Sequence, residues 1–134
     1  MSNKQFEKQK IIDFWVTSSD DDFDTMMAMY NTHRYNWSLF LGHLTLEKIL
    51  KAYFAKVKND YPPFTHNLLK LAKDSNLTLS DEVKINLTTI TAFNFNTRYD
   101  DYKRSFQKKC TPEFTSEWID KIKEIRVWIK EQTK

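Results

Sequence analysis

The sequence predicts an all-α protein, an up-and-down antiparallel helical bundle of four to five helices. Glycine occurs once and proline three times in 134 residues, and so few chain-breaking residues favour long helices over a sheet with many tight turns. Apolar residues recur at helical spacing along most of the chain. Hydrophobic residues make up 40% of the sequence, which is enough for a packed core. The length predicts a single domain over residues 1–134, with its core at about residues 15–130.

The first half of the chain is expected to hold two shorter helical segments and one long helix. A helix over about residues 4–17 leads into the domain. The run Ser18–Asp22 precedes apolar residues at helical spacing from Phe23. This pattern indicates a helix start, because Ser and Asp accept hydrogen bonds from free backbone N–H groups and acids suit the positive end of the helix dipole. The helix over residues 35–58 is apolar on more than one face, which predicts a central position or contact with a partner chain. Gly42 in its middle predicts close approach of another helix.

The second half is expected to hold three helices. Pro62 and Pro63 end the long helix, because proline lacks a backbone N–H and restricts the residue before it. Thr65 is the expected cap of the short helix that follows. The order Thr111-Pro112-Glu113 fits an N-cap, a proline in the first helical position and an acid in the first turn. The three helices are therefore expected at about residues 65–75, 80–99 and 112–133. A highly polar loop is expected between the last two, over residues 100–111.

Composition restricts the class of protein only broadly. The single cysteine, Cys110, has no partner for an internal disulfide, which fits a reducing compartment. No secretory signal or membrane-spanning run is visible, so a cytoplasmic location without membrane contact is expected. The net charge of +3 favours nucleic acid only weakly. The Ser18–Asp22 acids lack the glycine of a calcium loop and the histidines are scattered, so no metal and no cofactor is expected.

Three motifs, in order, resemble those of the HEPN domain family. Residues 43–52, His-Leu-Thr-Leu-Glu-Lys-Ile-Leu-Lys-Ala, are similar to the family's H-x-x-x-E-K-x-L-K-A core. Residues 65–71, Thr-His-Asn-Leu-Leu-Lys-Leu, are similar to its T-H-x-L-x-x-L segment, and residues 98–101, Arg-Tyr-Asp-Asp, to its R-Y-P-D signature. The resemblance implies an up-and-down helical bundle, commonly a dimer. It also implies a module that associates with nucleotides or RNA, or that works beside a small nucleotidyltransferase in toxin–antitoxin pairs.

The chain departs from the ribonuclease branch of that family, which uses an R-x4-6-H motif. After Arg98, the positions where the histidine would fall are Lys103, Arg104 and Ser105, and all three histidines lie before Arg98. Asp100 in place of proline frees the helix end to continue or to turn differently. The usual base for metal-free RNA cleavage is therefore missing from its expected place.

Two groups of residues are candidates for a site, and each allows two interpretations. His43, Glu47 and Lys51 repeat every four residues along one helix stripe, which fits either a groove for a phosphate or a buried network that fixes helix packing. His66 is expected in the first turn of the short helix, as a ligand or base or as a capping residue. The end of the fourth helix is either a dipole-stabilising network in which Arg98 pairs with an acid, or an anion cradle with stacking aromatics. The candidate binding residues are Arg98, Tyr99, Asp101, Lys103, Arg104, His43, Glu47, Lys51 and His66.

Three functions are ordered by these observations. The first is a HEPN-like interaction or binding module that binds a nucleotide or RNA, or pairs with a nucleotidyltransferase-type protein. The second is a ribonuclease toxin with a variant site built on Arg98, Tyr99 and either His43 or His66. The third is a structural dimerisation domain without a ligand. A homodimer is expected in each case, with the long helix and the last helix as first candidates for the contact.

Overall fold

The fold is all-α and contains no strand among the residues that the computed structural model describes, 7–134, of which residue 100 is described by its backbone only. Six helices account for most of this chain, one or two more than the sequence predicted. Their bounds are α1 Lys8–Asn31, α2 Tyr35–Lys58, α3 Leu68–Asp74, α4 Asp81–Arg98, α5 Asp100–Lys109 and α6 Pro112–Gln132.

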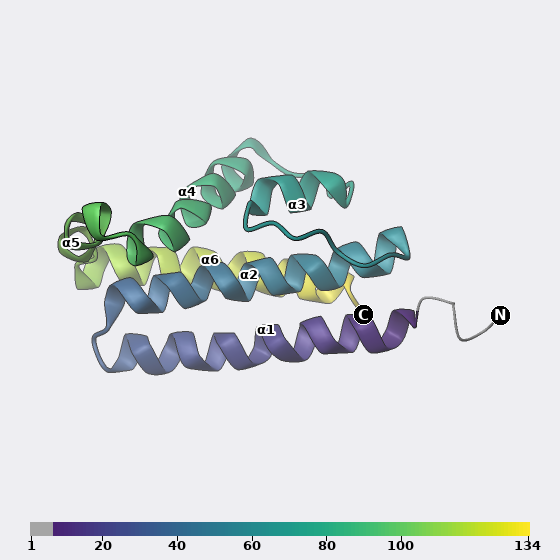
Figure 1. Ribbon diagram of the computed structural model, residues 1–134, viewed down its shortest axis with the longest axis horizontal. Coiled ribbons are helices and arrows are strands. Elements are labelled where there is room, and N and C mark those ends of the chain that lie inside the picture. Colours follow the sequence, from purple (N-terminus) through teal and green to yellow (C-terminus); the bar gives the residue numbers. More distant parts are fainter. Residues whose placement is uncertain (1–6) are drawn as a thin grey trace.

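The long helix α2 is the centre of the bundle, as its apolar pattern predicted. It contacts every other helix. Helix α1 runs antiparallel to it along nearly its whole length, α6 packs against another side, and α3 and α4 lie across from α1 (Figure 1). Helix α5 covers the end where α4 stops and α6 begins (Figure 1). The largest fully buried apolar side chains come from all of these helices except α5 and are Met26, Leu39, Leu46, Ile49, Leu50, Leu68, Leu71, Leu87, Ile90, Ile122 and Ile129.

Gly42 has the packing role that the sequence predicted. A Cβ atom at this position would lie 2.5 Å from Ile122 Cδ1 of α6 and 3.3 Å from Met26 Sδ of α1. The glycine therefore lets α1 and α6 approach α2 at the same level, and this closeness offsets the propensity cost of about 1 kcal/mol for glycine inside a helix.

The predicted helix start at Ser18–Asp22 is wrong, because α1 continues through this run from Lys8 to Asn31. Ser19 is buried, and its hydroxyl donates a 2.8 Å hydrogen bond to the Thr45 carbonyl oxygen of α2. Asp20 accepts hydrogen bonds from Arg126 of α6. These polar side chains therefore bind α1 to its neighbours rather than capping a helix. The part of the predicted first helix that covers residues 4–6 lies outside the described residues.

The predicted loop over residues 100–111 is also wrong, because residues 100–109 form helix α5. Tyr99 takes an extended conformation between α4 and α5, and its carbonyl oxygen accepts hydrogen bonds from the N–H groups of Tyr102 and Lys103. Phe106 is buried against Phe93 of α4, with ring centroids 5.4 Å apart. Burial of this one aromatic ring outweighs the high polarity of the segment, which had indicated a loop.

Three helix starts have a side-chain cap of the expected chemistry. Asn67, Ser80 and Thr111 accept hydrogen bonds from the N–H groups three residues later, at 3.0, 3.2 and 3.1 Å. The cap at Thr111 was predicted, and Ser80 caps the helix that was expected to begin at about this residue. Thr65 was the wrong residue for the short helix, because that helix begins at Leu68 and Asn67 caps it.

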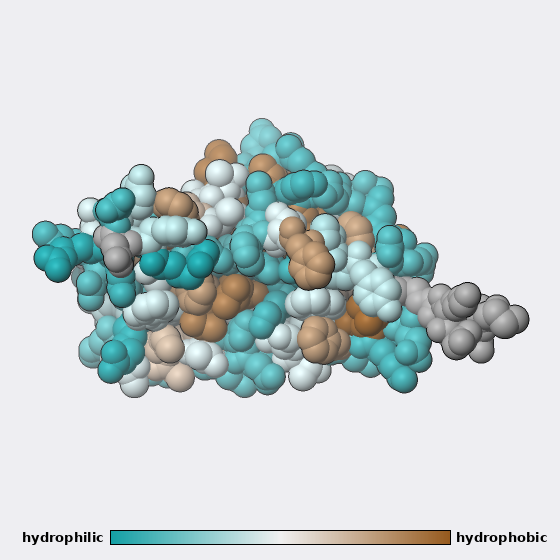
Figure 2. Space-filling model, in the orientation of Figure 1, coloured by the Kyte–Doolittle hydropathy of each residue, from teal (hydrophilic) through white to brown (hydrophobic). Residues whose placement is uncertain are grey.

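The surface is mixed in character. Figure 2 shows hydrophobic groups over the middle of the molecule, where α1 and α2 lie, and mostly hydrophilic groups at the end formed by α5. None of the helices described here is long and apolar enough to cross a membrane.

Candidate functional site

The three stripe residues of α2 lie in a buried polar network. His43, Glu47 and Lys51 are all buried. The two carboxylate oxygens of Glu47 have different partners: Oε2 lies 2.9 Å from Lys51 Nζ, and Oε1 lies 2.8 Å from Nδ1 of His66. Lys51 also lies over the ring of Trp15, 5.0 Å from its centroid. The Glu47 carboxylate of α2 is thus linked to the segment before α3 through His66, and to Trp15 of α1 through Lys51.

The charge on Glu47 is maintained by these partners. Burial is the largest influence and would raise the pKa of Glu47, but the hydrogen bonds from His66 and Lys51 together outweigh it. The pKa of Glu47 therefore lies below its ordinary value, and the group is a carboxylate near neutral pH. Because both oxygens are occupied by donors of this chain, Glu47 has little capacity left for a ligand.

His43 is fully buried and uses both ring nitrogens inside the protein. Nε2 lies 2.7 Å from the His66 carbonyl oxygen, which only accepts, so Nε2 carries the proton. Nδ1 then accepts from the side-chain amide of Asn94, 3.3 Å away on α4. Burial lowers the pKa of His43. The imidazole is therefore neutral and fixed in one tautomer, and it has no nitrogen free to act as a base.

Arg98 is the outward end of the same network. Its Nε donates to Asn94 Oδ1 at 2.7 Å, one helical turn before it. Its guanidinium carbon lies 5.4 Å from the centroid of the Tyr99 ring. The predicted pairing of Arg98 with an acid does not occur with any described carboxylate; the amide of Asn94 takes that place. Asn94 was not among the residues predicted from the sequence.

His66 differs from His43 in its access to solvent. Its side chain is 66% exposed. It lies before α3 rather than in the helix's first turn, where the sequence pattern had placed it. Glu47 accepts the hydrogen bond from Nδ1, so the protonated nitrogen faces the carboxylate and Nε2 has no described partner. Glu47 thus holds the ring through Nδ1, and Nε2 is directed to water.

The second predicted group forms an exposed aromatic and cationic surface at the end of α4 and on α5, which we call the α4–α5 surface. The Phe95 and Tyr99 rings are stacked at 4.4 Å, and the Tyr102 ring lies 5.0 Å from Phe95. Lys103 lies 5.3 Å from the ring centroid of Trp37 on α2. The residues of this surface are Trp37, Phe95, Arg98, Tyr99, Tyr102, Lys103 and Arg104.

The cations of the α4–α5 surface are not neutralised by nearby acids. Among the described side chains, no carboxylate forms an ion pair with Arg98, Lys103 or Arg104. Asp101 is exposed beside them and also has no described ion-pair partner. Phe95 was missed in the sequence, although its spacing of four and seven residues to Tyr99 and Tyr102 signals a shared side.

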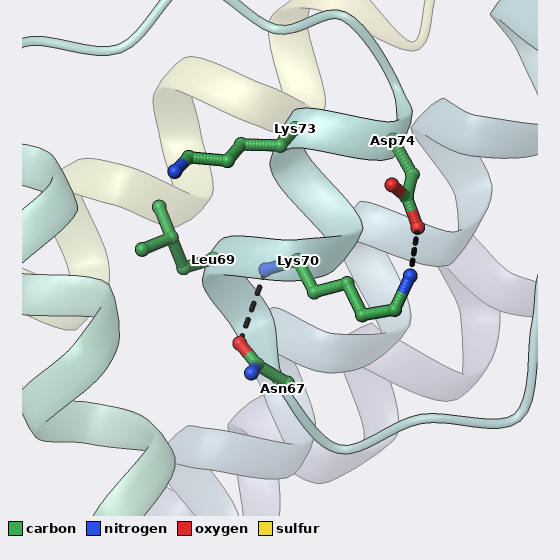
Figure 3. Close-up of a pocket in the computed structure, with 5 residues that line it drawn as sticks. All are labelled: Asn67, Leu69, Lys70, Lys73 and Asp74. Carbon is green, nitrogen blue, oxygen red and sulfur yellow. Dashed lines mark hydrogen bonds and ion pairs between the residues drawn. The ribbon is translucent and has the colours of Figure 1, made fainter.

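A shallow pocket on α3 lies apart from both groups. It is lined by Asn67, Leu69, Lys70, Lys73 and Asp74 (Figure 3). Asn67 caps the helix through Lys70 N, and the Lys70 side chain pairs with Asp74 at 2.8 Å, so three of its polar residues serve α3 itself (Figure 3). None of the residues predicted from sequence lines this pocket. Elsewhere in the described chain, no group of three or more His, Cys, Asp or Glu side chains is arranged to hold a metal ion.

Comparison with known proteins agrees with this architecture. The crystal structure of TT1696 from Thermus thermophilus superposes with a TM-score of 0.78 at 16% sequence identity, covering 90% of this chain and 97% of that one. At this identity the likeness demonstrates the shared fold alone. No curated protein sequence matches the chain. The family model of the HEPN domain matches residues 12–132, nearly the whole chain. The chain belongs to the HEPN domain family.

Proposed function

We propose that the chain is a HEPN binding module that holds single-stranded RNA, or a nucleotide, by its phosphate groups on the α4–α5 surface. The observation that carries this proposal is the exposed Phe95–Tyr99–Tyr102 ring cluster beside cations that have no described acidic partner. Stacking aromatics next to unpaired cations are the combination that binds single strands, because bases stack on the rings while the phosphates meet the positive charge.

The geometry of Arg98 supports a phosphate partner. One edge of the guanidinium is fixed by Asn94, and its planar group lies next to Tyr99. The remaining N–H donors are free for a bidentate contact with phosphate oxygens. Because Asn94 is itself held by buried His43, little side-chain entropy remains to be lost when Arg98 binds.

Binding of a fluorescently labelled single-stranded RNA, measured by anisotropy over a range of salt concentrations, tests the proposal. If about three phosphates contact Arg98, Lys103 and Arg104, the affinity should fall with salt with a log–log slope of roughly −2. Arg98→Ala, and the double variant Lys103→Ala/Arg104→Ala, should each weaken binding roughly tenfold. Lys58→Ala/Lys73→Ala removes two exposed cations elsewhere and is the matched control for charge. Equal losses in the control and in the α4–α5 variants would leave only a non-specific charge effect and contradict the proposal.

A second candidate function, a ribonuclease with a variant site, is favoured by one observation: the unpartnered Nε2 of His66. A histidine whose Nδ1–H is held by a carboxylate is oriented to accept a proton at Nε2. In such a reaction Nε2 takes the 2′-hydroxyl proton, the 2′-oxygen attacks the phosphorus, and the bond to the 5′-oxygen breaks. The leaving 5′-oxygen takes a proton from water, and the resulting hydroxide is neutralised by the proton held on Nε2, which yields a 2′,3′-cyclic phosphate and a 5′-hydroxyl end. His43 cannot take this role because it is fully buried and both of its nitrogens are engaged.

Incubation of the protein with single-stranded RNA in the presence of a chelator separates the two functions. Cleavage to cyclic phosphate ends that is lost in His66→Gln and kept in His33→Gln, an exposed histidine outside the site, would favour the ribonuclease. Binding without cleavage in the wild-type chain would favour the binding module. Loss of both activities in His66→Gln with an unchanged melting temperature would indicate that His66 contacts RNA in either case.

We also infer a homodimer. Apolar side chains that are only partly buried follow one side of α2, where Trp37 and Phe40 contact edge to face at 5.8 Å and Leu44 lies one turn further. A continuous apolar stripe of this kind supports association with a second copy. Light scattering at tens of micromolar should give twice the chain mass of 16.1 kDa, whereas a monomer mass would contradict the proposal.

A nucleotidyltransferase-type partner is proposed from the family resemblance alone. If a gene for a small nucleotidyltransferase neighbours this one, the two proteins are expected to co-purify after co-expression. Separate elution of the two proteins at micromolar concentration would contradict the pairing.

A further inference from the structure

A groove lies between α4 and α6, and it is lined by two carboxylates, an amide and an indole without a described ion-pair, hydrogen-bond or cation partner. It has a volume of about 140 Å³ and is lined by Glu82, Val83, Asn86, Lys121, Glu124, Ile125 and Trp128. Glu82 and Glu124 form no ion pair with any described residue. Two carboxylates that share a groove without a cation repel each other, so a positive group placed between them would be favoured.

Asn86 is the most informative residue of the groove. It is only 9% exposed, yet its side-chain amide forms no hydrogen bond with another described residue. Its amide atoms are not among the fully enclosed unpaired atoms of the described chain, so the amide meets solvent through the groove. The amide oxygen of Asn86 is therefore an open acceptor in a groove that already holds two carboxylates, and a donor that enters the groove would meet all three.

Trp128 adds an aromatic face that is open to a cation. Three of the four tryptophans have a lysine over the ring: Trp15, Trp37 and Trp118, with cation-to-centroid distances of 5.0, 5.3 and 4.2 Å. Trp128 is 38% exposed and has no described cation over it. The indole is the best side chain for a cation–π contact.

The lysine that lines the groove does not supply the missing charge. Lys121 Nζ pairs with Glu117 at 2.9 Å and lies over Trp118, both on its own helix. Its ammonium group is therefore engaged one turn away from Glu124. Glu82 and Glu124 thus remain the uncompensated charges of the groove, and their negative charge disfavours a phosphate there.

We propose that this groove binds an arginine side chain of a partner protein. A guanidinium is planar and carries five N–H donors, so one group can lie on Trp128 and donate to Glu82, Glu124 and Asn86 at the same time. Val127 is exposed next to Trp128 in the chain and provides apolar contact for a residue that flanks such an arginine.

The test uses amide chemical shifts of the full-length labelled protein titrated with small probes. Capped arginine should shift signals confined to residues 82–86 and 121–128, and the tripeptide Leu-Arg-Leu with capped ends should bind more tightly because a leucine adds apolar contact at Val127. Capped citrulline, which has the shape of arginine without the charge, should cause no such shifts. Absence of shifts with arginine, or equal shifts with citrulline, would overturn the proposal. Tighter binding of spermine than of the tripeptide would identify a free polyamine instead of a protein and would overturn it as well.

Variants separate binding from a role in the fold. Glu124→Gln should weaken binding of the tripeptide about tenfold, whereas Glu113→Gln, on the same helix but outside the groove, should leave binding unchanged. Asn86→Leu should weaken binding while keeping or raising the melting temperature, because the amide that it removes forms no hydrogen bond with a described residue. A lowered melting temperature with unchanged binding in Asn86→Leu would mean that the amide serves the fold, and the proposal would fail.

Discussion

Asn94 and Arg98 lie one turn apart on α4 and are hydrogen-bonded to each other, but Asn94 belongs to the interior and Arg98 to the surface. Asn94 is buried and links His43 of α2 to α4. Its amide therefore supplies hydrogen bonds that water cannot supply in the interior. Arg98 is exposed and directs its charge outward beside Tyr99. In the interior the cost of an unmet hydrogen bond dominates, whereas at the surface solvent screens the same interactions. Substitutions inside should therefore change stability, and substitutions outside should change binding.

The largest effect on stability is expected at Glu47. Glu47→Leu removes the carboxylate that compensates buried Lys51, and breaking such a buried pair costs about 3–5 kcal/mol. Denaturant unfolding of the wild-type and variant chains measures the difference. The double variant Glu47→Leu/Lys51→Met should recover most of the loss, because no unpaired charge remains. A double variant no more stable than Glu47→Leu would show that the loss comes from packing.

A smaller loss of stability is expected when Asn94, the buried residue that links the two regions, is replaced. Asn94→Leu leaves Nδ1 of His43 without a donor, at a cost of about 1–3 kcal/mol. Arg98→Ala removes only an exposed side chain and should change the free energy of unfolding by about 0.5–1 kcal/mol. Both variants should weaken RNA binding, since Asn94 holds Arg98 in place. Equal destabilisation by both would mean that Arg98 is as much a part of the interior as Asn94.

The pH dependence of stability should follow the buried groups. Burial lowers the pKa of His43 below its ordinary value of 6.5, so below that pH the unfolded chain binds a proton that the folded chain does not. Stability should then fall by up to about 1.4 kcal/mol per pH unit as pH decreases from 6.5 toward the folded pKa of His43. Glu47, despite its burial, has a lowered pKa because of His66 and Lys51, so its contribution is lost in turn below its ordinary 4.5.

Denaturant unfolding at a series of pH values measures this profile. His43→Gln retains an amide that can donate and accept, and it should flatten the curve between pH 6.5 and 4.5. A wild-type profile that is flat over that interval would contradict the assignment of His43 as a buried neutral group.

The smallest effect on stability is expected on the aromatic part of the α4–α5 surface. Tyr99→Ala and Tyr102→Ala remove half-exposed rings and should each change the free energy of unfolding by less than about 0.5 kcal/mol. Each ring that stacks on a base should contribute about 1–3 kcal/mol to RNA binding. Anisotropy and thermal unfolding of the same variants test both statements. Large losses of stability together with unchanged binding would reverse the comparison between surface and interior.

Two of the sequence errors in the fold have a common physical cause. Ser18–Asp22 and residues 100–111 were interpreted from local polarity, as a helix start and as a loop. In both places partners distant in sequence decide the outcome: Thr45 and Arg126 bind the first segment, and Phe93 covers Phe106 in the second. Local propensity is a weak signal that a few buried contacts override.

Sequence patterns identified the candidate residues more completely than they identified the roles of these residues. The spacing of His43, Glu47 and Lys51 placed them correctly on one side of α2. Their different surroundings did not follow from spacing, because the segment that brings His66 to Glu47 lies nineteen residues further along the chain. Asn94 and Asn86 gave no signal in the sequence, since an asparagine inside an apolar stripe is informative only once its neighbours and their hydrogen bonds are known.

Periodicity, chain-breaking residues and sequence motifs were enough to predict the helical class, the central helix and its glycine, the cap at Thr111 and the family. The packing of the helices was needed to learn which histidine is buried and which faces water, that the acids of α1 bind neighbouring helices, and that unpartnered groups of α4 and α6 share one groove. These properties depend on burial and on distances between residues far apart in the chain, and the free energy of a charge or a polar group is set by what surrounds it.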